Sequence, residues 1–429
     1  MLMRHSDPRR RIRRRFARAA LILGLVWPGL PAHGQTAAPP DTATAVSPDE
    51  QAAFDRCKQD LAAEARARGV AQAVVASSLQ DLSPDPQVLT ASRQQAEFEK
   101  PLWDYIDAAV TETAIVDGRA KLGEWEPVLA AIETAYGVDR FVLAAIWGIE
   151  SGYGAVLDKP TKVRPVIRSL ATLACGGERA PYWRDELLAA LQIADRGGIP
   201  LDQLTGSWAG AMGHTQFMPT TYLRHAVDFD GDGRRDIWHS VPDALASTAN
   251  DLKAMGWRAG EGWGYEVVLP EGFDYALADE VTERPLAAWQ ALGVRVAGGQ
   301  PPAPTPTPAR LLVPAGARGP AFLLLPNFQV ILRYNTALSY ALAVAHLSDR
   351  LRGAGSLVQP WPRGDHMLSQ DERRDLQARL SERGFDAGGI DGKIGPKTRR
   401  AIRVYQAAAG LIPDGYADAI LLDRVRAGR

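Results

Sequence analysis

The sequence predicts a mainly α-helical protein with a small β element and a separate helical unit at the C-terminal end. Three observations lead to this fold class. Apolar residues recur at three- and four-residue spacing from about residue 50 to 265, and these runs stop at glycine. Short runs rich in Val and Pro follow between residues 265 and 325. A second helical pattern begins near residue 366, after a Gly- and Pro-rich stretch.

The composition is that of a globular protein with a large core. The chain has 429 residues, of which 46% are hydrophobic and 23% are charged. A chain of this length and composition is expected to form two or three domains.

The first 34 residues have the pattern of a secretory leader. An arginine-rich start is followed by the apolar run AALILGLVW and the small-residue ending AHG. The apolar run has about half the length of a bilayer-spanning helix, and Pro28 follows it at once, so a retained anchor is the weaker alternative. We therefore expect residues 1–34 to be a cleaved signal peptide, with general secretion or twin-arginine export as the two routes.

Loss of the leader changes the mature chain in two ways. It removes eight arginines and one aspartate, which takes the formal net charge from −1 to −8 and makes nucleic acid an unfavourable partner. It also accompanies export to an oxidising compartment, where Cys57 and Cys175 are expected to form a single disulfide. A reactive thiol is the alternative.

The remaining elements follow in order along the chain. Residues 35–49 form a Pro/Ala/Thr-rich tether without an apolar period, which we expect to be disordered. The next region is expected to be helical at 49–69, 123–137, 139–152, 184–198 and 241–257. Strands are expected at 265–270, 293–298, 309–315 and 321–326, and a helix returns at 334–353. Residues 356–367 are predicted to be a linker.

The C-terminal unit, residues 368–429, has the pattern of a compact helical domain. One helix is expected to end at Gly384, and a turn at about 391 leads into a second helix capped by Thr398. A third helix closes the unit at 416–428. The core is expected to consist of apolar residues on these helices, namely Leu376, Leu380, Ile402 and Tyr405.

The stretch WGIESGYG, residues 147–154, places a glutamate at the end of an apolar helix. Asp139 is expected to cap this helix, which runs from Arg140 to about Ser151 and directs Glu150 to the same face as Trp147. Apolar neighbours and the negative end of the helix dipole both raise the pKa of such a carboxyl group. A carboxylic acid that stays protonated near neutral pH can act as a general acid.

A structural role for Glu150 is the alternative. Buried glutamates are commonly paired with an arginine, and Arg164 and Arg179 are the candidates.

Residues 228–239, DFDGDGRRDIWH, resemble a calcium-binding loop. Asp228, Asp230 and Asp232 occupy positions 1, 3 and 5, and position 7 offers the backbone carbonyl of Arg234. Position 12 is His239, which cannot replace a bidentate carboxylate, so we expect calcium binding to be weak and structural. The alternative is an Asp/Gly turn that joins two helices without a metal.

Six motifs occur in an order that points to a family: GIESGYG, SLATLA, GSWAGAMGHTQFMP, VDFDGDGRRDIW, NDLKAMGW and ILRYNTALSYALAV. Over about residues 50–355 the chain resembles the membrane-bound lytic transglycosylase B family, which cleaves peptidoglycan. The resemblance implies a lysozyme-like α+β catalytic domain that requires no cofactor. The family also uses a calcium loop at the position of residues 228–239.

The resemblance assigns roles to individual residues. Glu150 matches the family's single catalytic acid. The substrate-binding positions line both sides of a cleft: Ser207, Gln216 and Phe217, the last as a sugar-stacking wall, face Tyr334, Asn335 and Tyr340. The chain has Glu178 and Arg179 where the family often has two adjacent arginines, and Asp251 where the family often has an aromatic residue. Each position also has a structural explanation, such as close packing of small residues in AGAMG or core tyrosines.

The implied reaction is cleavage of the β-1,4 bond between N-acetylmuramic acid and N-acetylglucosamine without water. Glu150 protonates the leaving oxygen, the N-acetyl group of the substrate stabilises the cationic centre, and Glu150 then takes the proton of the C6 hydroxyl. The product carries a 1,6-anhydro end. Two alternatives stay open: a muramidase that uses water, and a catalytically silent peptidoglycan scaffold.

The C-terminal unit resembles the three-helix peptidoglycan-binding domain of many wall enzymes. The resemblance rests on the turn DGKIGPKT before the helix AIRVYQ and places binding in the loops around Phe385 and Asp391. Together the two resemblances imply a periplasmic protein that acts as a monomer on peptidoglycan glycan strands, with cell-wall synthesis proteins as further partners.

Overall fold

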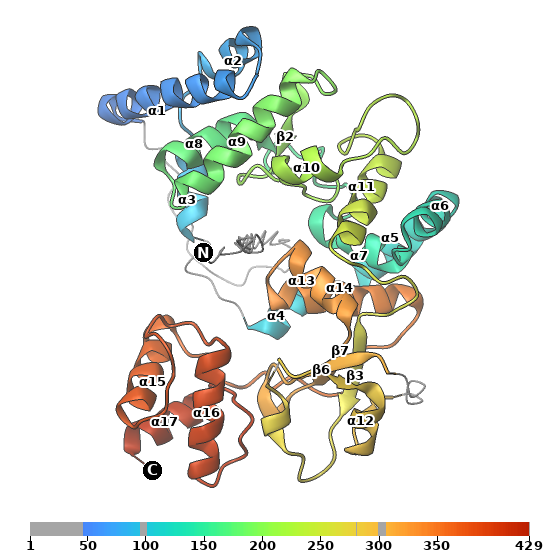
Figure 1. Ribbon diagram of the computed structural model, residues 1–429, viewed down its shortest axis with the longest axis vertical. Helices are drawn as coiled ribbons and strands as arrows, with labels where there is room; N and C mark the ends of the chain where they lie inside the picture. The colour runs from blue at the N-terminus through green and yellow to red at the C-terminus, as the bar shows by residue number, and fades with distance from the viewer. Residues whose placement is uncertain (1–45, 95–100, 280, 299–305, 429) are drawn as a thin grey trace, which may run out of the picture.

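The structure is a computed structural model that describes residues 46–94, 101–279, 281–298 and 306–428. The predicted signal peptide and the tether up to residue 45 lie outside these ranges. The described chain is mainly helical, with a five-stranded sheet and a pair of two-residue strands, which confirms the predicted fold class. The sheet, the short helix between its strands and the C-terminal helices lie in the lower part of Figure 1, and most of the other helices lie above them.

The first helical group is joined by a disulfide. It contains α1 (Pro48–Ala67), α2 (Gln72–Leu79), α3 (Pro86–Gln94), α8 (Val166–Gly176) and α9 (Ala180–Asp195). Ser47 and Glu50 form a capping box at the start of α1, so this helix begins inside the stretch predicted as a tether. A disulfide links Cys57 on α1 to Cys175 on α8, and the apolar faces of the group form one core cluster.

The second helical group surrounds Glu150. It contains α4 (Leu102–Ala109), α5 (Glu112–Glu124), α6 (Glu126–Tyr136), α7 (Arg140–Ser151), α11 (Val241–Ala254), α13 (Pro326–Tyr334) and α14 (Leu338–Arg352), with α10 (Pro219–His225) between the two groups. Helix α7 has the predicted bounds: Asp139 accepts a hydrogen bond from the Phe141 N–H, and Gly152 ends the helix at φ 58°. Its apolar face packs on α5, α11 and α14.

The β element is an antiparallel sheet in the order β4-β6-β7-β3-β5. Its strands are β3 (Gly264–Val268), β4 (Arg284–Pro285), β5 (Arg295–Val296), β6 (Pro308–Leu312) and β7 (Ala321–Leu324). Tyr265 on β3 is opposite Leu323 on β7. The short helix α12 (Leu286–Ala291) buries Trp289 in the core of this element.

Several elements, including α2, α3, α4 and α8, have no counterpart among the predicted ranges. Helix α13 starts at Pro326, whereas the sequence placed the return to helix at Tyr334; Pro326 stands at the first helical turn, where its missing N–H costs nothing. The strands β1 (Arg164–Pro165) and β2 (Thr205–Gly206) pair across a long sequence separation. A two-residue strand has no period that a sequence pattern can reveal.

The C-terminal domain consists of α15 (Gln370–Glu382), α16 (Pro396–Ala408) and α17 (Ala419–Ala427). The four predicted core residues all belong to its buried cluster. The predicted cap at Thr398 is wrong, because α16 begins after Gly395 with Pro396 in its first turn. The Thr398 hydroxyl instead donates a hydrogen bond to the Ala387 carbonyl and accepts one from Gln377, which closes the domain's core.

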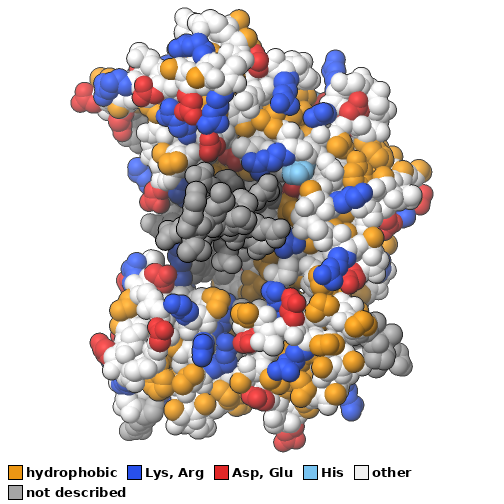
Figure 2. Space-filling model, in the orientation of Figure 1, with side chains coloured by type: hydrophobic (Ala, Val, Ile, Leu, Met, Phe, Trp, Pro, Cys, Tyr) orange, Lys and Arg blue, Asp and Glu red, His pale blue; other side chains and the backbone are white. Residues whose placement is uncertain are grey.

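The surface and the helices give two further observations. On the face shown in Figure 2, acidic and basic side chains are interspersed. Within the described ranges, no helix has the combination of length and apolar character that crossing a membrane requires.

Candidate active site

Glu150 is a buried acid on the last turn of α7. Its side chain has only 5% exposure, and the Tyr340 hydroxyl donates a hydrogen bond of 2.7 Å to its Oε1. Burial raises the pKa of the Glu150 carboxyl from its ordinary 4.5 to about 8, and the Tyr340 hydrogen bond opposes this shift. The acid therefore holds its proton at neutral pH and has a second oxygen from which to donate it.

The alternative of an arginine partner for Glu150 is wrong. Arg164 forms an ion pair with Asp85, with 2.8 Å between Nη1 and Oδ2. The guanidinium of Arg179 lies over the rings of Tyr182 and Trp183, at 4.8 Å and 5.3 Å from their centroids. Arg179 adopts a left-handed backbone conformation just before α9, and its predicted saccharide contact stays a prediction.

His214 fixes the end of α7 to the loop that follows β2. The Trp147 indole N–H donates to His214 Nδ1 at 3.0 Å, and the Ser151 hydroxyl donates to the His214 carbonyl at 2.6 Å. Burial lowers the pKa of His214 to about 4, so its ring is neutral and accepts the indole hydrogen bond. A Cβ on Gly154 would lie 2.6 Å from the imidazole, so this position requires glycine.

The sequence interpretation missed His214, although it lies inside the quoted motif GSWAGAMGHTQFMP. Its role is visible only when Trp147 and the loop meet in space. Trp147 and His214 are 67 residues apart in the sequence, so no local pattern could reveal the hydrogen bond between them.

Ser207 and Gln216 shape the same loop through their own hydrogen bonds. The Ser207 hydroxyl accepts hydrogen bonds from the N–H groups of Ala209 and Ala211, at 3.3 and 3.2 Å. Gln216 has φ 54°, which is uncommon for a residue with a side chain, and its Nε2 donates to the Gly213 carbonyl at 2.9 Å. Strained positions of this kind are enriched at functional sites, so Gln216 stays a substrate-binding prediction.

Phe217 is a core residue, which corrects its predicted place in a sugar-stacking wall. Its side chain is 2% exposed and packs in the core of the first helical group. Its backbone forms a bridge to Met212, with both N–H groups donating. Side-chain burial alternates along TQFMP, so Gln216 is partly exposed whereas Phe217 points into the core.

Two tyrosines form the wall beside Glu150. The rings of Tyr334 and Tyr340 stack with centroids 6.5 Å apart and an interplanar angle of 13°. The Tyr334 hydroxyl donates to the Thr215 carbonyl at 2.6 Å, which ties this wall to the loop opposite. Asn335 ends α13, and its side-chain oxygen accepts the Ala337 N–H ahead of α14. The structure thus brings Tyr334 and Tyr340 together with Glu150.

Tyr105 is a partly buried tyrosine that the sequence interpretation did not name. It lies on α4, partly buried against the same core as Tyr340. Burial and the nearby charge of Glu150 both raise the pKa of its phenol. The segment PLWDYIDAAV carries no motif of the family resemblance, so only the packing of α4 on α14 reveals this tyrosine.

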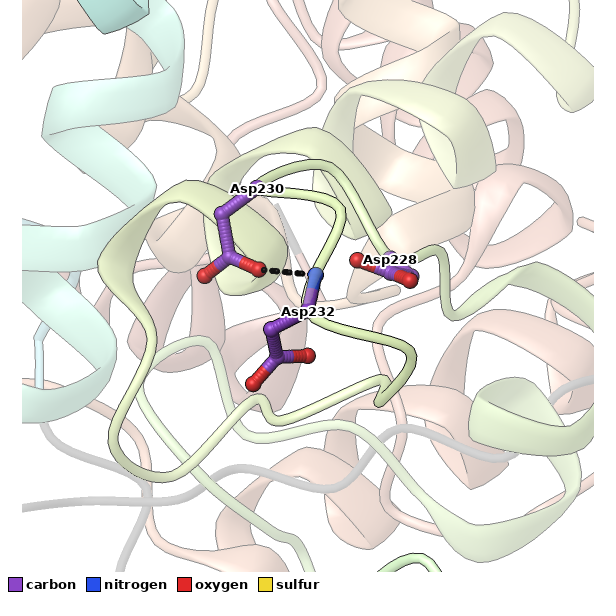
Figure 3. Close-up of side chains that lie close together, drawn as sticks. All are labelled: Asp228, Asp230 and Asp232. Atoms are coloured by element: carbon purple, nitrogen blue, oxygen red, sulfur yellow. Dashed lines mark hydrogen bonds between the residues drawn. The ribbon is translucent and has the colours of Figure 1, made fainter.

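The predicted metal loop brings three exposed aspartates together. One carboxylate oxygen from each of Asp228, Asp230 and Asp232 lies within 4.8 Å of the others (Figure 3). The loop is folded by its own backbone: Asp228 accepts the N–H groups of Gly231 and Gly233 at 2.7 and 2.9 Å. Carboxylate oxygens in such a cluster are the ligands that a hard divalent cation prefers.

The second half of the loop has a histidine, and not a bidentate acid, at position 12. His239 at position 12 is exposed, and its Nδ1 lies 3.0 Å from Asp236 Oδ2. Buried Asp243 accepts the N–H groups of Phe229 and Asp236, at 2.7 and 2.8 Å. The backbone N–H of Arg234 donates to Asp232 at 2.8 Å. The sequence interpretation missed Asp236, although it occupies position 9, where calcium loops often place a ligand.

Comparisons with known proteins agree on one family. Residues 53–349 match the family model described as transglycosylase SLT domain, and residues 369–425 match the putative peptidoglycan binding domain. The chain is 34% identical over 274 residues to the membrane-bound lytic murein transglycosylase B of Escherichia coli K12, which covers 62% of this chain and 72% of that protein.

Solved structures give the same result. SltB3 from Pseudomonas aeruginosa, solved in complex with NAG-NAM-pentapeptide, is 47% identical with a TM-score of 0.83, covering 87% of this chain and 99% of that chain. The Escherichia coli lytic transglycosylase Slt35, solved in complex with calcium, is 27% identical with a TM-score of 0.59, covering 69% and 92%.

Proposed function

Because this chain belongs to the lytic transglycosylases of the transglycosylase SLT domain family, as its motif order predicted, we propose that it cleaves peptidoglycan without water. The bond is the β-1,4 linkage between N-acetylmuramic acid and N-acetylglucosamine, and the product carries a 1,6-anhydromuramyl end. The observation that supports this proposal is the buried carboxyl group of Glu150, protonated at neutral pH and hydrogen-bonded to Tyr340.

Glu150 acts first as an acid and then as a base. Its proton passes to the glycosidic oxygen as the C1–O bond breaks, and the substrate's N-acetyl group stabilises the cationic C1. The Glu150 carboxylate then takes the proton of the C6 hydroxyl, whose oxygen bonds to C1 and closes the anhydro ring. Each turnover returns the proton to Glu150, so the sum is balanced without water. The intramolecular attack has a high effective concentration over water.

Tyr340 suits both halves of this cycle. Its hydroxyl holds Oε1 in place when Glu150 is protonated, and it stabilises the carboxylate when the proton has left. A hydrolytic muramidase normally uses two carboxyl groups. The pKa of Glu150 is set by burial and by the Tyr340 hydrogen bond. The group beside Glu150 is therefore a tyrosine and not the second carboxyl group of a hydrolase, which favours the transglycosylase reaction.

We infer that the C-terminal domain binds peptidoglycan through the loops around Phe385 and Asp391. A wall-binding domain on the same chain raises the local concentration of substrate at the catalytic cleft. The loop at Asp228, Asp230 and Asp232 offers a fitting oxygen set for a weakly bound structural calcium ion. The leader at 1–34 supports a periplasmic location for the mature chain.

Mass spectrometry of purified sacculi after digestion tests the reaction. We expect anhydromuramyl fragments with no new reducing ends, whereas reducing muramic acid would establish the muramidase instead. A Glu150→Gln variant should release nothing. Glu186→Gln is the matched control, because Glu186 is also buried, at 3% exposure, but accepts its hydrogen bonds from the N–H and hydroxyl of Thr220 on α10. Unchanged release by Glu150→Gln would remove this acid from the mechanism.

A further inference from the structure

The segment between the two domains, residues 357–365, is fixed at both ends; we call it the strap. At its start, the Glu266 carboxylate on β3 accepts the N–H groups of Val358 and Gln359, at 2.9 and 2.8 Å. At its end, Asp365 accepts two hydrogen bonds from Arg318, at 2.9 and 2.7 Å. Arg318 also bonds Asp418 of the C-terminal domain at 2.7 Å. The predicted linker is therefore an ordered part of the catalytic domain's surface.

The middle of the strap contacts α4 through an aromatic contact and an ion pair. Trp361 is 8% exposed, and its ring centroid lies 6.0 Å from that of Trp103 on α4 and 6.4 Å from that of Phe322 on β7. Two residues later, Arg363 forms an ion pair with Asp107, also on α4, in which Nη2 lies 3.1 Å from Oδ1. Trp103 and Asp107 are four residues apart, so they lie on one face of the helix.

The opposite side of α4 also packs on the core that contains Tyr340. Tyr105 follows Trp103 by two positions, which places it about 200° around the helix from the strap. Helix α4 packs directly on α14, the helix that carries Tyr340. Tyr105 packs, partly buried, against the core cluster that contains Tyr340 and Trp147. A shift or rotation of α4 would therefore move Tyr105 relative to Glu150.

We propose that the strap positions the active site, with Trp361 and Arg363 holding α4 so that Tyr105 and Tyr340 keep their placement around Glu150. This inference rests on the proposed transglycosylase function and adds to it. The match to the catalytic family ends at residue 349, so the strap lies outside it. The proposal therefore assigns part of the rate of the chemical step to residues that follow the catalytic match. Substrate capture by the C-terminal domain would instead affect only binding to the wall.

The test uses the full chain and a soluble glycan of two NAG-NAM units, whose turnover does not depend on wall binding. We expect Trp361→Ala to lower kcat about tenfold with KM changed by less than about twofold, because the placement of catalytic groups is lost while the cleft remains. Trp361→Phe should recover most of the rate. Trp257→Ala is the matched control, since Trp257 is equally buried in the same core cluster.

A double-mutant cycle with Tyr105→Phe separates positioning from general destabilisation. If the strap acts through α4, Trp361→Ala should cost less than about threefold in the Tyr105→Phe background. All rates are measured below the onset of thermal unfolding of each variant. A wild-type kcat in folded Trp361→Ala, or an equal loss in both backgrounds, would overturn the proposal. Absence of anhydro products from the wild-type chain would be the separate failure of the proposed function.

Discussion

Two acidic regions of this protein treat their carboxyl groups in opposite ways. Glu150 is alone, 5% exposed and hydrogen-bonded to a tyrosine, and burial raises its pKa to about 8. Asp228, Asp230 and Asp232 are exposed, and their oxygens crowd within 4.8 Å of one another. The same functional group is thus kept neutral in one place and presented as clustered oxygen ligands in the other.

The role of a carboxyl group in this protein therefore depends on its environment and not on its residue type. An isolated carboxyl in an apolar setting avoids the cost of a buried charge by keeping its proton, which is what proton donation requires. Carboxylates in water keep their charge and suit a cation. Replacing Glu150 by glutamine removes a proton donor, whereas replacing one of the clustered aspartates by asparagine removes a negative charge. The two replacements should therefore have different effects on activity.

The largest expected effect is the loss of activity on changing Glu150 to Gln. An amide cannot donate and then recover a proton, so kcat on sacculi should fall by about 10³-fold or more. The same chemical change in the other region, Asp230→Asn, should leave kcat within about twofold. Both rates come from release of soluble fragments under identical conditions. Equal losses in the two variants would contradict the division of roles.

The next effect concerns the pH at which Glu150 works. Its general-acid form is lost as pH rises through about 8, so activity should decline on the alkaline side. The Tyr340 hydrogen bond lowers the pKa of Glu150, so Tyr340→Phe should raise this pKa further and move the alkaline limb of kcat/KM to higher pH. We expect kcat itself to fall roughly tenfold, because the carboxylate loses a charge-assisted hydrogen bond.

The pH–rate profiles of wild type and Tyr340→Phe, measured on one soluble glycan, provide the check. Tyr222→Phe is a suitable control, because the Tyr222 hydroxyl is also hydrogen-bonded but to the Arg235 carbonyl near the other acidic region. An alkaline limb that stays in place, or moves to lower pH, would show that Tyr340 does not stabilise the Glu150 carboxylate.

A smaller effect is expected on stability. The folded-state pKa of Glu150 is raised from 4.5 to about 8, so the folded chain binds this proton more tightly than the unfolded chain. The stabilisation is complete below pH 4.5 and is lost as pH rises toward about 8. Glu150→Gln lacks this loss, so its Tm relative to wild type should rise by a few degrees between about pH 5 and about pH 8.

Thermal unfolding of both proteins across this range measures the difference. Asp232→Asn serves as the contrast, since it makes the same acid-to-amide change at an exposed position. A Tm difference that stays constant with pH would mean that Glu150 titrates alike in the folded and unfolded chains.

Local patterns predicted the parts of the molecule that local physics decides. The bounds of α7 followed from Asp139 and Gly152, and the aspartate loop from its own spacing. The missed features depend on contacts between distant segments: His214 with Trp147, Tyr105 with the core around Tyr340, and Trp361 with Trp103. No periodicity within one segment records such a contact. Phe217 was misplaced for the same reason, since a motif names a residue but not the direction of its side chain.

The smallest expected effect belongs to the aspartate loop. Calcium should raise the Tm of the wild type by only a few degrees at millimolar concentration, with kcat unchanged, because three carboxylates without a bidentate acid bind weakly. His239→Glu supplies that acid at position 12 and should tighten calcium binding by about tenfold or more, whereas His239→Gln should not. Thermal unfolding in calcium, with magnesium for comparison, measures both. If Asp230→Asn kept the full calcium response, the cation would have to bind elsewhere, and the contrast between a neutral and a charged acidic region would lose its second half.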